Sequence, residues 1–400
     1  MAGSHAHNID IINTNTAAKP PDEFQTLKTI IISSAHAIHD TYAGFIAPFL
    51  PFMIERLSLM KVEAGVFLLF YQGASILQPF IGHLGDRINL RKIALVMPAI
   101  TGITLSLLGT APTFFIAIMY SLVAGISSAS MHAILPALVG SISGKQIGKG
   151  MSFWMVGGEI GVMIGPLLIT LVVTTISLEA TRWLMIPGIL MSIILSLLLK
   201  NLPDHNNGNN HQVKAPIKEM TAIMLPLAGM IVMRALLRTA SEIYLPVFLL
   251  EKGAGIWLAG ISLTILQGFG VIGTIAGGFL KDKFGFRTVM VLSIIIASLS
   301  MIGFVYTNRA MQIVNLAVMG TFSMMVLPVG MAYIQEHFPN NRSLANGYYL
   351  ATLFAINAVG GVATGFLYDQ FGGFNTFLWS GIAGFLGVPF IFMLPIEAKN

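Results

Sequence analysis

The feature that most constrains this chain is a series of twelve apolar stretches, each long enough to cross a lipid bilayer as a helix. A spanning helix needs about 20 mainly apolar residues. Only 10% of the 400 residues are charged, against roughly 25% in soluble domains. The pattern predicts an all-α membrane protein with transmembrane helices at about 29–54, 63–84, 92–110, 113–140, 151–176, 182–200, 221–250, 257–280, 288–307, 311–335, 345–368 and 374–395.

A polar segment divides the twelve stretches into two sets of six. The run from Asn201 to Lys218 is too hydrophilic for lipid and is typical of a flexible linker. The first 28 residues are polar and lack the basic-then-apolar pattern of a signal peptide. We therefore expect a disordered cytoplasmic tail (1–28), an N-terminal six-helix bundle (29–200), a cytoplasmic linker (201–220), a C-terminal six-helix bundle (221–395) and a short cytoplasmic tail (396–400).

The basic residues predict how the chain lies in the membrane. With the amino terminus inside, 15 of the 22 Lys and Arg residues fall on the cytoplasmic side, 5 on the opposite side and two within a span. Cytoplasmic loops are enriched in Lys and Arg, so both termini are expected in the cytoplasm. The net charge of +5 has the same origin, and because no run of five basic residues occurs, nucleic acid is not an expected partner. The absence of cysteine excludes disulfides, thiol catalysis and thiolate metal sites.

Two motifs occur once in each half of the chain. Residues 82–91 read GHLGDRINLR and residues 278–287 read GFLKDKFGFR, so both follow one glycine–acid–base pattern at the end of the second helix of a half. A second pair, residues 161–165 and 361–365, begins and ends with glycine. Two halves repeated in parallel are the architecture of one large class of transporters.

Together with the layout of six spans in each half, the doubled loop motif resembles the pattern of the major facilitator superfamily. The resemblance covers the chain from residue 29 onward. Within that superfamily, residues 36–40 (HAIHD), Gln78-Pro79 and residues 125–132 (GISSASMH) resemble the fosmidomycin resistance protein group. The superfamily resemblance implies two bundles around a central cavity that opens alternately to each side.

The same resemblance implies gating residues. The aspartates of the loop motif and its flanking residues would latch the cytoplasmic ends of the bundles, although such turns could simply keep the loops inside. Gly161, Gly165 and Pro166 resemble a glycine-rich motif of proton-driven exporters, whereas glycines at this spacing also allow close helix packing. The usual coupling arginine of span four is replaced by Ser121, so coupling must use other groups. The predicted gating set is Gly82, Asp86, Arg87, Arg91, Gly278, Asp282, Lys283, Arg287, Gly161, Gly165 and Pro166.

Several titratable residues lie in the middle of predicted spans, where a charge is costly and is typically functional. His36, His39 and Asp40 share one helical face, because they are three and four residues apart. Histidine titrates near neutral pH and a neighbouring carboxylate favours its protonated form, so this group is a candidate proton site. A fixed hydrogen bond is the structural alternative, and three such residues on one turn rarely all reach one metal ion, so no metal is expected. The predicted proton-coupling set is Asp40, His36, His39, His132 and Glu159.

Arg234, Arg238 and Glu242 form a stripe at four-residue spacing in the seventh span. The guanidinium groups cannot lose their charge, so both need anions. Glu242 is one turn from Arg238, which leaves Arg234 to bind a carboxylate or phosphonate of a substrate. The internal repeat places these arginines opposite the acid–imidazole group. The predicted substrate-binding set is Arg234, Arg238, Glu242, Tyr71, Gln72, Gln267 and Tyr333, although a lone polar residue here more often bonds helix to helix.

These features favour a monomeric secondary transporter in the inner membrane of a bacterium, which exports a small organic anion or drug in exchange for protons and needs no cofactor. One alternative is a transporter of a metabolite or a metal chelate through the same cavity. Another is a membrane enzyme such as an acyltransferase, but the His36–Asp40 spacing inside a span does not suit one. No nucleotide-binding motif occurs, which argues against direct ATP drive.

Overall fold

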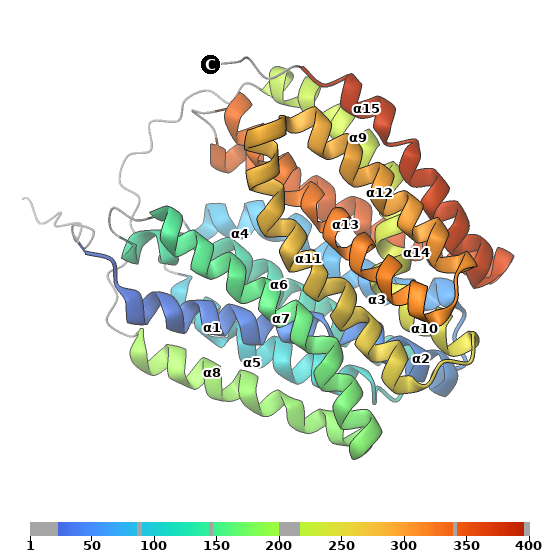
Figure 1. Ribbon diagram of the computed structural model, residues 1–400. Coiled ribbons are helices and arrows are strands. Elements are labelled where there is room, and N and C mark those ends of the chain that lie inside the picture. The colour runs from blue at the N-terminus through green and yellow to red at the C-terminus, as the bar shows by residue number, and fades with distance from the viewer. Residues whose placement is uncertain (1–22, 86–89, 144–146, 200–216, 339–341, 396–400) are drawn as a thin grey trace, which may run out of the picture.

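The computed structural model describes residues 23–85, 90–143, 147–199, 217–338 and 342–395. This part of the chain is helical and contains no strand (Figure 1). Within it, eight segments are long and apolar enough to cross a membrane as single helices. The remaining predicted spans are helices interrupted by a break or a turn, one shorter apolar helix at Lys92–Leu108, and one that shares a long helical segment with its neighbour. The twelve-helix prediction is therefore confirmed.

The N-terminal half consists of six membrane-crossing segments. The first is α1 (Thr26–Ala43) with α2 (Ile46–Leu57), and the second is α3 (Lys61–Gly73) with η1 (Ala74–Leu77) and α4 (Gln78–Gly85). The others are α5 (Arg91–Leu108), α6 (Phe114–Ile142), α7 (Ile147–Thr175), and η2 (Glu179–Leu184) with α8 (Met185–Leu198).

The C-terminal half repeats this order. Its first segment is α9 (Ile217–Thr239), a π-helical turn η3 (Ala240–Tyr244) and α10 (Leu245–Glu251). It continues with α11 (Ile256–Phe284), α12 (Phe286–Tyr306) and α13 (Arg309–His337). The last two segments are the two helices joined at a kink in α14 (Arg342–Phe385), and α15 (Val388–Phe392) follows the second of them.

Glycines with positive φ make two of the sharp turns in this half. Gly285 has φ 78° and separates α11 from α12, and Gly372 has φ 75° and forms the kink inside α14. A side chain is strained in this backbone region, whereas glycine adopts it readily. Each turn sends the chain back across the bundle, and the second one explains why a single helical segment supplies two spans.

The two halves meet at one end of the molecule. We call this the far end, and the end where α1 begins and α15 finishes the terminal end. The largest apolar cluster joins the halves at the far end and includes Phe49 and Phe67 of the first half and Tyr244 and Phe248 of the second. Two further clusters lie toward the terminal end, and each stays within one half. Packing of α3 on α14 and of α7 on α11 completes the contact between the halves.

Hydrogen bonds and an ion pair reinforce the far-end contact. Both carboxylate oxygens of Asp369 on α14 accept from backbone N–H groups at the start of α3, from Lys61 at 2.9 Å and from Val62 at 2.8 Å. The Lys61 ammonium pairs with Glu251 of the second half at 3.2 Å. An acid at a helix N-terminus satisfies free N–H groups and complements the helix dipole. The far end is therefore sealed by polar as well as apolar contacts.

Some sequence predictions fall outside the described residues. This applies to most of both tails, to residues 201–216 of the predicted linker, and to Asp86 and Arg87 of the first loop motif. Gly82, Arg91 and Asp282 lie in helices whose side chains at these positions are also outside the described part. The predicted domain boundaries and the loop-motif latch remain predictions.

Candidate functional site

A row of glycines brings α7 against α1 and sets the position of the candidate site. Gly157, Gly161 and Gly165 recur every fourth residue, so they lie along one face of α7. A Cβ atom added at any of the three would overlap a backbone carbonyl oxygen of α1. Only glycine permits this approach, as in other membrane helices with small residues at this spacing. The predicted gating residues Gly161 and Gly165 thus serve close packing here, and Pro166 follows beside Gly44 at the end of α1.

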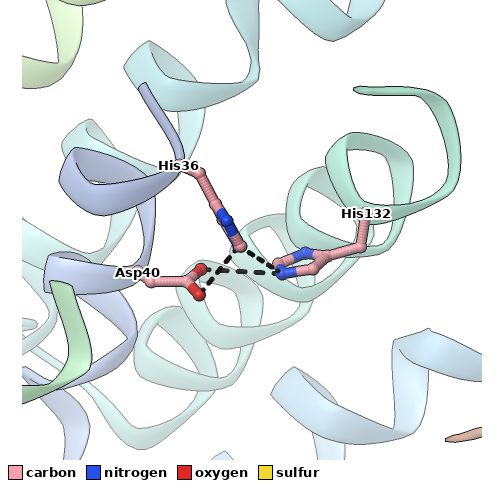
Figure 2. Close-up of side chains that lie close together, drawn as sticks. All are labelled: His36, Asp40 and His132. Atoms are coloured by element: carbon pink, nitrogen blue, oxygen red, sulfur yellow. Dashed lines mark hydrogen bonds and ion pairs between the residues drawn. The ribbon is translucent and has the colours of Figure 1, made fainter. Parts of the chain in front are cut away.

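His36, Asp40 and His132 come together beside this contact (Figure 2). We call these three side chains the trio. His36 Nε2 lies 3.0 Å from Asp40 Oδ2 and 3.1 Å from His132 Nε2. His132 Nε2 lies 3.7 Å from Asp40 Oδ1. The trio is largely buried, with side-chain exposures of 6% for His36, 13% for Asp40 and 28% for His132.

Backbone carbonyls determine which nitrogen of each imidazole carries a proton. His36 Nδ1 is 2.8 Å from the carbonyl oxygen of Trp154, whose ring also stacks on the imidazole at 3.7 Å. His132 Nδ1 is 2.9 Å from the carbonyl oxygen of Ser128. A carbonyl oxygen only accepts, so both Nδ1 atoms must donate. In the neutral rings both Nε2 atoms are then acceptors, and they face each other and a carboxylate.

A cation is therefore required between the three side chains. Without one, the contacts at 3.0 and 3.1 Å would set acceptor against acceptor, which is unfavourable in a buried site. One added proton on His36 Nε2 can serve both Asp40 and His132, and it balances the negative charge of Asp40. Two imidazoles and a carboxylate with donor atoms within 4.8 Å of one another also match the ligand types of a transition metal. A divalent ion would leave one uncompensated positive charge, so the charge balance favours a proton.

His39 and Glu159 differ in how they relate to the trio. His39 has an exposure of 0%, and within the described residues neither of its ring nitrogens has a hydrogen-bond partner. It lies beside His132, with ring centroids 5.8 Å apart, rather than in the trio. Glu159 follows Gly158 on α7 and lies within electrostatic reach of Asp40 on one side and of Arg238 and Glu242 on the other. Glu159 is therefore within electrostatic reach of both the trio and the charged pair of the second half.

The charged pair is Arg238 with Glu242, as their four-residue spacing predicts. Arg238 Nε donates to Glu242 Oε2 at 2.9 Å, and the side chains are 15% and 13% exposed. Glu242 lies in the π-helical turn η3, and such turns are frequent at functional sites. Its second oxygen, Oε1, is buried and has no partner in the described part of the chain. Glu242 can therefore accept another hydrogen bond when its surroundings change.

Arg234 occupies a different environment from Arg238. Its exposure is 4%, and its guanidinium donates to the backbone carbonyl and the hydroxyl of Ser323 on α13, inside the C-terminal half. The predicted substrate contact of Arg234 is untested. Its burial makes Arg238 the more accessible of the two arginines.

A family model described as Major Facilitator Superfamily matches residues 32–308 and 227–400. The chain belongs to the Major Facilitator Superfamily. Membership of this superfamily identifies a multi-pass membrane transporter of small molecules, and not an enzyme.

Individual relatives agree with this family. The chain is 24% identical over 393 residues to the MFS-type transporter YfnC of Bacillus subtilis, covering 92% of this chain and 93% of that protein. It is 23% identical over 353 residues to the fosmidomycin resistance protein of Escherichia coli, covering 85% and 86%. Among solved structures, a mutant of the nucleoside transporter NupG superposes with a TM-score of 0.76 at 16% identity, over 92% of this chain and 100% of that one. Because the identity to NupG is only 16%, this similarity shows the fold alone.

The other predicted site residues of this superfamily member are dispersed. Tyr71 of α3 is buried beside the trio, within electrostatic reach of Asp40 and next to Ser128. Gln72 has a buried amide oxygen without a partner in the described residues, and Gln267 is half-buried on α11. Tyr333 lies in the apolar core of the second half and donates to the carbonyl oxygen of Pro395 at 3.0 Å. The structure thus brings Tyr71 to the trio and places Tyr333 elsewhere.

Arg287 and Lys283 of the second loop motif contact residues of the C-terminal half. Arg287 donates to the carbonyl oxygens of Phe392 and Leu394, which anchors the end of α15. Lys283 is exposed, with its ammonium group 5.2 Å from the ring centroid of Phe284. A Cβ atom added at Gly278 would meet nothing within 4 Å. None of these contacts crosses to the other half.

Sequence analysis missed the contribution of α7 to the trio. Trp154 supplies the carbonyl and the stacking ring for His36, and a Cβ atom added at Gly158 would lie 2.5 Å from His36 Cε1. Trp154 lies one turn before Gly158, so both positions belong to the face of α7 next to α1. The four-residue glycine spacing identifies that face. The sequence does not show which α1 side chain meets it.

Proposed function

We propose that this transporter exports a small organic anion or drug in exchange for protons, across the inner membrane of a bacterium with both chain termini in the cytoplasm. The observation that carries the proposal is the trio. Two imidazole Nε2 atoms and one carboxylate converge in the trio without a hydrogen-bond donor, so the trio binds a cation. A single proton balances the negative charge of Asp40. A titratable site in the middle of a membrane protein is what coupling to a proton gradient requires.

The position of Glu159 suggests how proton and substrate communicate. It is within electrostatic reach of both the trio and the Arg238–Glu242 pair, which belong to different halves of the molecule. An anionic substrate that binds Arg238 competes with Glu242 for the guanidinium. The charge of a bound substrate then acts on Glu159 and, through Glu159, on the trio. This electrostatic linkage ties the two binding events through three acidic side chains.

Substrate class and direction are supported by other observations. Arg238 is a permanent cation whose planar donors suit carboxylates and phosphonates. Similarity to the fosmidomycin resistance protein extends over 85% of the chain and favours export of a drug. With cytoplasmic termini, the sealed far end faces outward and the conformation loads from the cytoplasm. An exporter takes up its substrate in that state.

Drug susceptibility of an efflux-deficient bacterial host that expresses the chain tests this proposal. The panel contains carboxylates, phosphonates including fosmidomycin, and neutral compounds. We expect raised tolerance of at least one anionic compound, lost in the Asp40→Asn variant and retained in Glu55→Gln, which makes the same acid-to-amide change at an exposed position. Unchanged tolerance to the whole panel, or greater sensitivity that indicates import, would contradict the proposal.

A further inference from the structure

A small space lies between helices of the C-terminal half, away from the trio. It has a volume of about 10 Å³ and is bounded by α9, α12, α13 and the end of α14. Its lining consists of Arg234, Leu237, Ser293, Ile294, Ala297, Ser298, Ser323, Val326 and Gly384. A volume of about 10–15 Å³ on this measure holds one water-sized particle. The space is therefore suited to one atom or a very small molecule and not to an organic substrate.

The polar groups around this space are hydrogen-bond donors. Arg234 supplies the only charge in the lining, and the other polar side chains are hydroxyls. Ser293 and Ser298 are 1% and 0% exposed, and neither hydroxyl has a partner within the described residues. Ser300 on the same helix instead donates to the carbonyl oxygen of Ile296, one turn earlier, at 2.8 Å. The hydroxyls of Ser293 and Ser298 are therefore available to bond to a particle in the cavity.

The charge of Arg234 also lacks a direct counterpart. Among the described residues, no carboxylate lies within ion-pair distance of its guanidinium, and Glu242 of the adjoining turn η3 is paired with Arg238. Arginine stays charged in proteins. An unpaired buried charge is strongly destabilising, whereas a paired and hydrogen-bonded one is tolerated. A bound anion would supply this missing charge.

We propose that this cavity binds a single halide ion, chloride under physiological conditions. The guanidinium of Arg234 provides the charge, and the hydroxyls of Ser293, Ser298 and Ser323 donate hydrogen bonds to the ion. Ser323 accepts from Arg234 at 3.2 Å, which leaves its own O–H as a donor. The arginine excludes a cation, and the small volume excludes a polyatomic anion such as phosphate.

The ion has a structural consequence that is separate from the transport proposal. Arg234 is on α9, Ser293 and Ser298 are on α12, and Ser323 is on α13. A shared ion therefore links three helices of one half. It also keeps Arg234 inside the bundle and away from substrate. A halide effect is expected whether or not the trio couples transport to protons.

Thermal unfolding of the purified full-length protein in detergent tests the proposal directly. Unfolding is followed over a range of potassium chloride or bromide concentrations, with potassium gluconate keeping the ionic strength constant. Binding to the folded state raises the unfolding temperature in a concentration-dependent way. We expect this rise with both halides. The Ser293→Ala/Ser298→Ala variant should weaken apparent halide affinity by about tenfold or more, the loss expected for a hydrogen bond to a charged group.

The Ser300→Ala variant is the matched control, because its hydroxyl on the same helix is already bonded to Ile296. It should keep the wild-type halide response. Anomalous scattering from crystals grown in bromide should show one peak between Arg234 and Ser298. Equal unfolding temperatures in halide and gluconate, with no bromide peak in the cavity, would show that the space holds only water and would overturn the proposal.

Discussion

The two histidines nearest His132 in the first helix differ in what their ring nitrogens contact. His36 bonds through both nitrogens, whereas His39 is fully buried with neither nitrogen partnered in the described residues. Removing a buried polar group that makes no bond relieves a cost of about 1–3 kcal/mol. We therefore expect His39→Leu to retain transport with an equal or higher unfolding temperature.

His132→Gln is expected to behave in the opposite way. It removes one of the two imidazoles that share the proton, so uphill transport should fall while the protein still folds. The sequence predicts a proton site formed by His36, His39 and Asp40, whereas the trio contains His132 in place of His39. Transport assays and thermal unfolding of both variants distinguish these two sites. Loss of coupling in His39→Leu with normal coupling in His132→Gln would reverse this assignment.

Arg238 is the second residue whose role depends on charge and shape together. Arg238→Lys keeps the positive charge but loses the planar pair of donors. Affinity for an anionic substrate should fall by about 1.5–3 kcal/mol, the range for a hydrogen bond to a charged group. Substrate binding is measured in parallel with Arg234→Lys, which should leave substrate affinity nearly unchanged because Arg234 lies inside the bundle. Equal losses in the two variants would show that Arg234 also contacts substrate.

At the scale of helices, the packing of α1 on α7 holds the trio together. A Cβ atom at Gly161 would overlap the carbonyl oxygen of Ala37, one residue after His36. Gly161→Ala should therefore separate the helices, cost about 1–3 kcal/mol as other overpacked sites do, and weaken coupling. Gly347→Ala is the control, since an added Cβ there meets nothing within 4 Å. The same stability and coupling in both variants would contradict this role.

The sequence predicts those features of the site that depend on one helix, and not those that depend on how two helices pack. Spacing within one helix is fixed by helical geometry, so the Arg238–Glu242 pair and the glycine face of α7 are predictable. The position of His132 depends on how α6 is rotated relative to α1, which no single-helix pattern contains. The same holds for Trp154, whose backbone carbonyl carries no signal in its side chain, and for Arg234, whose direction depends on Ser323.

For the whole molecule, the contacts at the far end predict which conformation is favoured. Asp369 belongs to the C-terminal half and accepts hydrogen bonds from the first N–H groups of α3 in the N-terminal half. Asp369→Ala removes these bonds between the halves. A lost cap costs about 1–2 kcal/mol, so opening at the far end should become several times more populated. The chain contains no cysteine, so labelling of Ala64→Cys, buried on α3, measures this opening.

Glu63→Ala is the matched control, because Glu63 caps the same helix by accepting from Met60 of its own half. It should not change labelling. Asp86→Ala, in the predicted latch at the opposite end, should instead increase access from the terminal end. Faster labelling in Glu63→Ala and Asp369→Ala alike would indicate loosening of α3 and not release of the contact between halves.

The most direct test of proton coupling is transport by Asp40→Asn in proteoliposomes with an imposed pH gradient. Exchange of labelled for unlabelled substrate is measured in the same vesicles without a gradient. Asparagine keeps the size of the side chain but removes the charge that the shared proton balances. We predict that the variant exchanges substrate at a rate close to that of the wild type but no longer concentrates it. Accumulation by Asp40→Asn as strong as that of the wild type would contradict the assignment of coupling to the trio.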